Sequence, residues 1–242
     1  MTELPRYLQL LWGREPEGRR GPKPGRTIEE IGAAAVAIAD RDGLEAVSMK
    51  SVAQAVGFTT MSLYRYVDSK EELTAVMLDL AYGPPTFRYP RRSTWRKRIT
   101  LWAKEIATVR LARPWSVELA QGGPPLTPNA LSWTERGLEA LAGTPLTSQE
   151  RLSALLAIDV WGQNHVRLST QMGLVGRSDP DRVEVSWFGL ILRVVDKERF
   201  PHLLTAGAES LDDADEDFFE EEFERGLGLL LDGIAALIAR QS

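Results

Sequence analysis

The chain has 242 residues and a formal net charge of −5; 43% of its residues are hydrophobic and 26% are charged, as in an ordinary folded protein. Cysteine is absent, which excludes disulfides, thiolate metal ligands and a cysteine nucleophile and fits a reducing cytoplasm. No apolar run reaches the roughly 18 residues of a membrane span, so we expect no membrane partner.

Residues 1–26 are rich in proline and glycine, which disfavours a helix, and we predict a flexible arm there. The arm is basic although the protein is acidic: it carries Arg19, Arg20, Lys23 and Arg26. A slim basic segment suits the minor groove of DNA, where arginine responds to groove width and negative potential. A solvated tail without a partner is the alternative that the composition leaves open.

Four short helices are predicted between residues 27 and 82. Hydroxyl residues that cap helix N-termini mark the starts, and glycines mark two of the ends. The starts are Thr27, Ser48, Thr59 or Thr60, and Ser69, and the ends are Gly43 and Gly57. Thr27 with Glu30 has the spacing of a capping box, and so has Ser69 with Glu72.

The second and third of these helices, joined by a glycine turn, have the pattern of a helix-turn-helix. Such a motif places the first residues of its second helix at base edges in the major groove, and here these are Thr59, Thr60 and Met61. Leu63 and Val67 are expected to face the core. The remaining side chains would then point outward or to the side, and these are Ser62, Tyr64, Arg65 and Tyr66. From spacing alone, a plain helical hairpin remains an alternative.

Phosphate contacts are expected around the helix starts. The free N–H groups at Thr27, Ser48 and Ser69 suit phosphate oxygens, and Lys50 and Lys70 lie within a turn of two of these starts.

Residues 93–242 are predicted to form longer helices, at about 95–109, 127–142, 147–172, 181–197 and 215–240, so the fold class is all-α. Thr147 and Glu150 form a capping box at the third of these. The last helix has a broad apolar face, which we interpret as a dimer seam shared with helix 147–172; burial within one subunit is the alternative. The seam residues are Phe223, Leu227, Leu230, Ile234 and Leu237. Glycines within that helix suggest that a neighbouring backbone comes close.

A ligand pocket needs apolar walls and a few polar groups that orient the ligand. The candidates are Trp102, Trp115, Trp133, Trp161, Asn164 and His165. Packing of the same tryptophans in the core is the alternative. No motif assembles a catalytic set, and we predict no enzyme activity, metal or cofactor.

The stretch "VSMKSVAQAVGFTTMSLYRYVDSKEEL", preceded by "IGAAAVAIADRDGLEA", resembles the DNA-binding domain of the TetR family of transcriptional repressors over about residues 27–79. One departure is Tyr66, where histidine is common. The positions that match the family's DNA contacts are Thr27, Ser48, Lys50, Thr59, Thr60, Met61, Tyr64, Tyr66 and Lys70.

The resemblance implies an N-terminal three-helix DNA-binding domain, residues 27–82, and a tetracycline-repressor-like helical domain for ligand binding and dimerisation, residues 93–242. It further implies a homodimer that binds a palindromic operator and is released by a small-molecule inducer. The other hypothesis is a helical ligand-binding or adaptor module that never binds DNA. Salt-steep binding to DNA would separate the two.

Overall fold

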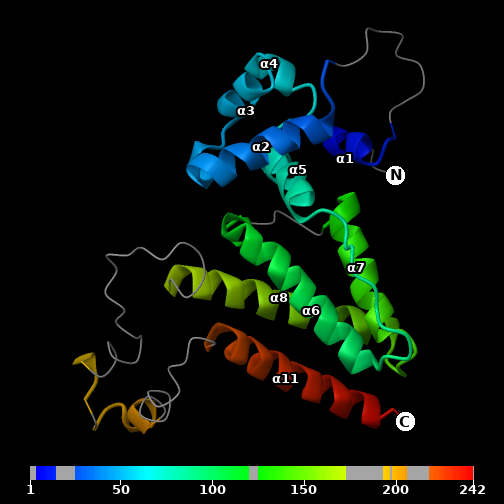
Figure 1. Cartoon of the computed structure of the whole chain (residues 1–242), viewed down its shortest axis with the longest axis vertical. Helices are drawn as coiled ribbons and strands as arrows, with labels where there is room; N and C mark the ends of the chain where they lie inside the picture. Colours follow the sequence, from blue (N-terminus) through cyan, green and yellow to red (C-terminus); the bar gives the residue numbers. More distant parts are fainter. Residues whose placement is uncertain are drawn as a thin grey trace.

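The computed structural model describes residues 4–14, 25–119, 125–172, 193–196, 198–205 and 218–241, and all regular secondary structure in these ranges is helical. The described chain forms two helical units, an N-terminal one and a C-terminal one (Figure 1). The C-terminal unit holds the helices between residues 95 and 239, which are called the long helices below. No helix among the described residues is long and apolar enough to cross a membrane.

The N-terminal unit contains α1 (Arg6–Leu11), α2 (Ile28–Asp42), a short 3-10 turn η1 (Leu44–Ala46), α3 (Met49–Ala55), α4 (Thr60–Leu63) and α5 (Lys70–Tyr82). Its core is aliphatic and includes Ile31, Val52, Leu63 and Val76, each fully buried. Helices α2 and α5 approach closely because Gly32 has no side chain: a Cβ there would lie 2.3 Å from a methyl carbon of Leu80.

The prediction of a flexible arm over residues 1–26 is wrong for residues 6–11, which form α1. Leu8 is only 1% exposed, and Tyr7, Leu10 and Leu11 pack against the core of the N-terminal unit. The indole N–H of Trp12 donates to the carbonyl of Leu126, 2.9 Å away in the segment before α7. Composition averaged over the arm hid this helix, because Pro5 precedes it as its N-cap and the other prolines follow it. Arg19, Arg20 and Lys23 lie outside the described residues.

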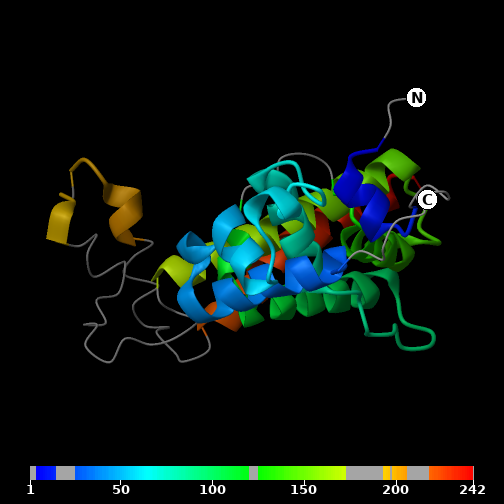
Figure 2. The ribbon, with the colours of Figure 1, turned by 90° about the horizontal axis from the view of Figure 1, so that it is seen from above.

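The C-terminal unit contains α6 (Trp95–Ala112), a 3-10 turn η2 (Pro114–Val117), α7 (Pro128–Leu141), α8 (Ser148–Met172) and α11 (Phe218–Ala239). Helix α8 packs against α6, α7 and α11, and Figure 2 shows the long helices running beneath the N-terminal unit. The starts predicted at Trp95, Thr127 and Thr147 are confirmed to within one residue. Most of the helix predicted at 181–197, and residues 215–217 of the last one, lie outside the described residues.

Helix α5 connects the two units mechanically. Near its end, the buried carboxylate of Asp79 accepts hydrogen bonds from the backbone N–H groups of Asn129 and Ala130 at the start of α7, at 2.9 and 3.1 Å. The indole N–H of Trp133 donates to the carbonyl of Gly83, 2.9 Å away. These bonds join the last turn of α5 and the residue after it to α7.

A second link joins the end of α6 to α2. The guanidinium of Arg113 contacts the carboxylate of Asp40 at 3.1 Å and donates to the carbonyl of Ala81 at 3.0 Å. The indole N–H of Trp115 donates to the same Asp40 carboxylate at 2.8 Å. The ring of Trp115 packs against the core of the N-terminal unit, and its contact with a ligand stays a prediction.

Candidate nucleic-acid interface

Helices α3 and α4 lie at the end of the molecule farthest from the long helices (Figure 1). Gly57 connects them with φ +75°, a left-handed backbone conformation that glycine adopts without strain. Helix α4 has only four residues before the chain passes into turns. The two helices nevertheless contact one another as a helix-turn-helix.

Helix α4 divides its side chains between the core and solvent. Leu63 and Val67 are fully buried, as predicted, whereas Met61 is 77% exposed and Tyr64 is 43% exposed. Thr60 is half-buried and Arg65 is exposed beside them. The exposed face therefore offers a hydroxyl, an apolar group, a phenol and a cation. These groups suit contacts to base edges in a DNA groove and to the phosphates on either side of it.

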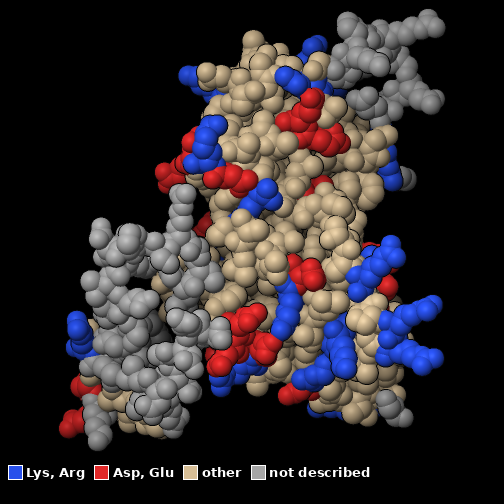
Figure 3. Space-filling model, viewed as in Figure 1, with Lys and Arg blue, Asp and Glu red and all other residues tan. Residues whose placement is uncertain are grey.

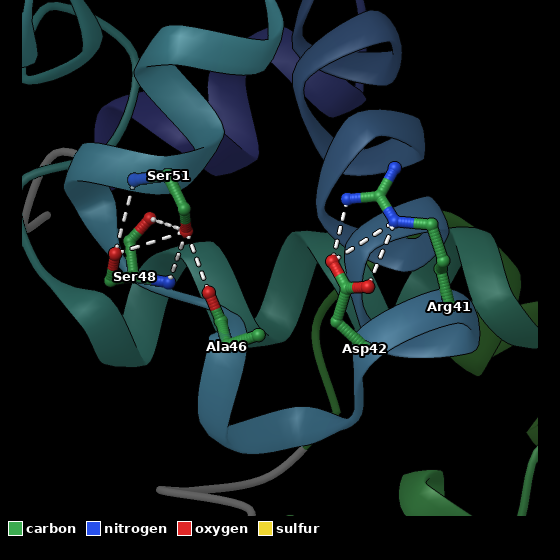
Figure 4. Close-up of polar contacts among 5 residues, drawn as sticks. All are labelled: Arg41, Asp42, Ala46, Ser48 and Ser51. Atoms are coloured by element: carbon green, nitrogen blue, oxygen red, sulfur yellow. Dashed lines mark hydrogen bonds and ion pairs between the residues drawn. The ribbon is translucent and has the colours of Figure 1, made fainter.

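The hydroxyl groups at the helix starts hold the local structure. Thr59 is the N-cap of α4, and its oxygen accepts from the backbone N–H of Ser62 at 3.2 Å. Ser48 and Ser51 form a reciprocal capping box at the start of α3, in which Ser51 also donates to the carbonyl of Ala46 (Figure 4). These bonds hold the first turns of α3 and α4 in place.

The capping boxes at Thr27 with Glu30 and at Thr147 with Glu150 are confirmed. At Ser69 the pattern differs. The serine hydroxyl caps Glu72, but the Glu72 carboxylate accepts from the backbone N–H of Asp68 instead.

The prediction that Tyr66 projects outward to touch DNA is wrong. Tyr66 is 9% exposed, its ring stacks on Phe58 at 5.7 Å, and its hydroxyl donates to the carbonyl of Arg26 at 3.1 Å. The guanidinium of Arg26 in turn contacts Glu30 and the carbonyl of Val56. Tyr66 and Arg26 thus tie the start of α2 to the helix-turn-helix.

Lys50 and Lys70 are exposed near the N-termini of α3 and α5. Neither makes an ion pair with another described residue, as is also true of Arg65. Lys and Arg atoms occur around this end of the molecule in the space-filling view (Figure 3). Cations free of ion pairs beside helix N-termini are chemically suited to phosphate.

Comparison with known proteins identifies this arrangement. Residues 31–77 match the family of bacterial regulatory proteins named tetR, and residues 89–238 match the tetracyclin repressor-like C-terminal domain. The chain is 35% identical to the HTH-type transcriptional repressor DrrR1 of Streptomyces coeruleorubidus, over 99% of this chain and 88% of that protein. The chain belongs to the TetR family. It is a DNA-binding transcriptional regulator with an N-terminal helix-turn-helix domain.

Solved structures share the fold. Apo ActR of Streptomyces coelicolor superposes with a TM-score of 0.74 at 21% identity, over 90% of this chain and 99% of that one. ActR has also been solved with actinorhodin. BioQ, solved with its double-stranded DNA operator, superposes with a TM-score of 0.60 at 17% identity, over 87% of this chain and 99% of that one.

Of the tryptophans predicted to line a ligand pocket in this TetR-family chain, two lie in the packed core. Trp102 and Trp133 are 2% and 4% exposed, and the indole N–H of Trp102 donates to the backbone carbonyl of Trp133 at 2.9 Å. Core packing, the alternative that the sequence left open, holds for both rings, and contact with a ligand stays a prediction for them. Asn164 differs: it lines an open depression beside α8 of about 420 Å³.

Trp161 and His165 lie together, as their spacing predicted, with ring centroids 5.5 Å apart. His165 is also 4.6 Å from the ring of Phe219, and its Nε2 lies 3.0 Å from the Phe219 carbonyl oxygen. Burial lowers the pKa of His165 despite that hydrogen bond, so the ring is neutral at pH 7. The buried indole nitrogen of Trp161 has no partner among the described residues. An aromatic cluster with one unsatisfied donor results.

The seam assigned to the last helix is wrong for three of its five residues. Phe223, Leu227 and Ile234 are between 2% and 8% exposed and pack inside the subunit. Gly226 accommodates the ring of Trp161 and not another backbone, since a Cβ there would lie 2.0 Å from a ring carbon. Leu230 and Leu237 remain half-buried at the edge of a groove between α8 and α11.

A buried ion pair, not predicted from the sequence, joins α6 to α8. Arg110 on α6 is 1% exposed, and its guanidinium lies 2.6 Å from the carboxylate of Asp159 on α8 and 3.4 Å from the hydroxyl of Tyr82 at the end of α5. Burial opposes the charge, but Asp159 and Tyr82 raise the pKa of Arg110 above its ordinary value. The available signal was an arginine four residues after Ile106, in the apolar stripe of its helix.

Proposed function

We propose that the protein is a ligand-responsive repressor that binds a palindromic operator as a homodimer. The observation that carries this is the exposed face of α4, with Met61, Tyr64 and Arg65 turned to solvent beside the ion-pair-free Lys50 and Lys70. Thr60 and Met61 read base edges, and the remaining groups contact phosphates. Ser48 and Thr59 cap their helices with their hydroxyls, and Ser48 donates its own backbone N–H to Ser51, so both residues act by shaping the helix starts that face phosphate.

The dimer forms through a face of α8 and α11 that one subunit leaves uncovered. On α8, Leu152, Leu156 and Val160 recur every four residues and are 45%, 63% and 54% exposed. On α11, Leu229 is 73% exposed, and Gly233 beside it has open space where a side chain would lie. Exposed apolar side chains that gather on two adjacent helices are typical of an interface between subunits.

Ligand binding is assigned to the region around Trp161, His165 and Phe219. The aromatic rings supply apolar walls, and the unpartnered indole N–H supplies a donor for a ligand. Asp159 lies on the same helix as Trp161 and holds Arg110, which contacts Tyr82 at the end of α5. A ligand that displaces α8 would therefore act on α5 through this pair and change the spacing of the two DNA-binding domains in a dimer.

Footprinting of the purified protein on the DNA that flanks its own gene tests the proposal. We expect a protected palindrome, binding that weakens steeply with salt, and release by a small molecule found in a screen. Binding of the small molecule without any salt-dependent DNA binding would favour the adaptor hypothesis and overturn this one.

A further inference from the structure

A second strongly basic surface lies in the C-terminal unit. Residues 84–98 connect α5 to α6 and form the first turn of α6, and this segment holds six basic residues and no acidic one. The six are Arg88, Arg91, Arg92, Arg96, Lys97 and Arg98. In a protein with a net charge of −5, such a segment concentrates positive potential at one place.

The first turn of α6 is positively charged, whereas the helix dipole favours negative charge at that end. Helix N-termini are stabilised by acidic residues, yet Arg96, Lys97 and Arg98 occupy the first turn, with no acid among them. Arg92 has φ 61°, a left-handed conformation uncommon for a residue other than glycine. Mutual repulsion and this conformation both disfavour the local fold, and a bound polyanion would offset the repulsion.

Two of the six cations have partners within the subunit. Arg96 pairs with Asp232 on α11 at 2.7 Å, and the guanidinium of Arg98 points to the carbonyls of Glu139 and Ala142 at 3.4 Å. The other four are exposed and make no ion pair with any described residue. These four, which we name the distal basic surface, are Arg88, Arg91, Arg92 and Lys97.

The chemistry of the distal basic surface suits a phosphate backbone better than a protein partner. The aromatic residues of the segment, Phe87, Tyr89 and Trp95, pack against the core of the C-terminal unit. No large apolar side chain between residues 84 and 112 is exposed. Protein interfaces need buried apolar or aromatic anchors, whereas phosphates need only cations, of which arginine is the best suited.

The distal basic surface lies at the opposite end of the subunit from α3 and α4. The connection after α5 runs down beside α7 to the lower right of Figure 1, and Lys and Arg atoms gather at that corner in Figure 3. Operator DNA bound at α4 therefore leaves these cations facing away from it.

We propose that the distal basic surface binds the phosphate backbone of a second DNA duplex while the helix-turn-helix holds the operator. This inference rests on the proposed DNA binding at α4. Once the protein is on the operator, flanking DNA on the same molecule is present at high effective concentration, so a weak surface that is not specific for sequence suffices. The protein would thereby bridge two segments of DNA.

A sequential capture assay tests this. Immobilised palindromic operator is loaded with protein, excess protein is removed, and a labelled duplex of unrelated sequence is added. We expect the unrelated duplex to be retained at low salt. The combined variant Arg88→Gln, Arg91→Gln, Arg92→Gln and Lys97→Gln should keep operator loading and lose retention. The slope of log retention against log salt should fall by about 0.9 for each phosphate contact removed.

A matched pair of variants controls for net charge. Arg91→Gln with Arg92→Gln is compared with Arg41→Gln and Arg225→Gln, which are exposed cations elsewhere on the subunit. Only the first pair should weaken retention. Failure of the first loading step would sink the proposed function. If the protein loads on the operator but does not retain the unrelated duplex, this inference alone is overturned. The same holds if the four-residue variant retains the duplex as well as the parent protein does. Retention of polyglutamate or of anionic phospholipid vesicles, but not of the duplex, would overturn the assignment of DNA as the partner.

Discussion

Replacing Asp159 with asparagine should destabilise the protein through the cation that it leaves behind. Arg110 is 1% exposed, and without the carboxylate its guanidinium keeps only the Tyr82 hydroxyl and uncharged groups of residue 159. Removing one partner of a buried ion pair costs about 3–5 kcal/mol. Asp159 is 31% exposed, so we expect the lower end, about 3 kcal/mol. For a chain of this length that corresponds to a fall in Tm of roughly 6–12 °C.

Thermal unfolding at one fixed protein concentration measures this effect, because the stability of a dimer depends on concentration. The double variant Arg110→Met with Asp159→Leu removes both charges and should recover most of the lost stability, since apolar residues often replace buried pairs at little cost. Asp42→Asn breaks an exposed pair with Arg41 and serves as the control, with no resolved change in Tm expected. A fall in Tm for Asp159→Asn no larger than that of the control would show that Arg110 does not need its carboxylate partner.

Three further outcomes are expected. Tyr66→Phe should cost about 1 kcal/mol of stability through its lost hydrogen bond and leave operator affinity nearly unchanged, whereas Tyr64→Phe should weaken binding to all DNA sequences without affecting Tm. Leu156→Glu combined with Leu229→Glu should give folded monomers in sedimentation, because both residues are exposed in one subunit. Leu8→Ala should lower the free energy of unfolding by about 2–5 kcal/mol, the usual cost of truncating a buried leucine.

The controls for these variants separate local from general effects. Leu126→Glu adds a charge at an apolar residue that is 46% exposed and lies away from α8 and α11, so it should stay dimeric. A dimer of unchanged affinity in the Leu156 and Leu229 variant would contradict the interface. Weaker DNA binding in the Tyr66 variant at unchanged stability would show that Tyr66 contributes to DNA binding. A Leu8 variant as stable as the parent would show that α1 contributes nothing.

The arm hypothesis for Arg19, Arg20 and Lys23 remains a prediction, and α1 changes how it is tested. Deleting residues 1–23 would remove a helix that packs in the core, so a loss of affinity would have two explanations. Glutamine at the three basic positions keeps α1. If the arm contacts phosphates, the salt slope should become shallower by up to about 0.9 for each of the three.

Features that depend on neighbours along the chain were predictable from the residues alone. Caps at Thr27 and Thr147 use a partner three residues away, and the turn at Gly57 needs the conformational freedom of one residue. The faces of a short helix follow from its period, so burial of Leu63 and exposure of Tyr64 could be read directly. These local rules gave the helix-turn-helix, and the family resemblance covers the same residues.

Which part of each apolar surface is covered depends on packing between distant segments and could not be predicted. The last helix is apolar on a broad face, and periodicity alone does not say which part packs on α8 of the same subunit and which part remains for another subunit. Phe223 and Leu229 are both large apolar residues of the last helix, yet their exposed fractions are 4% and 73%. In the same way Tyr66 is turned inward because Phe58 and the carbonyl of Arg26, 40 residues away, form its site. Contacts between segments distant in the chain are set by three-dimensional packing, and no local pattern encodes them.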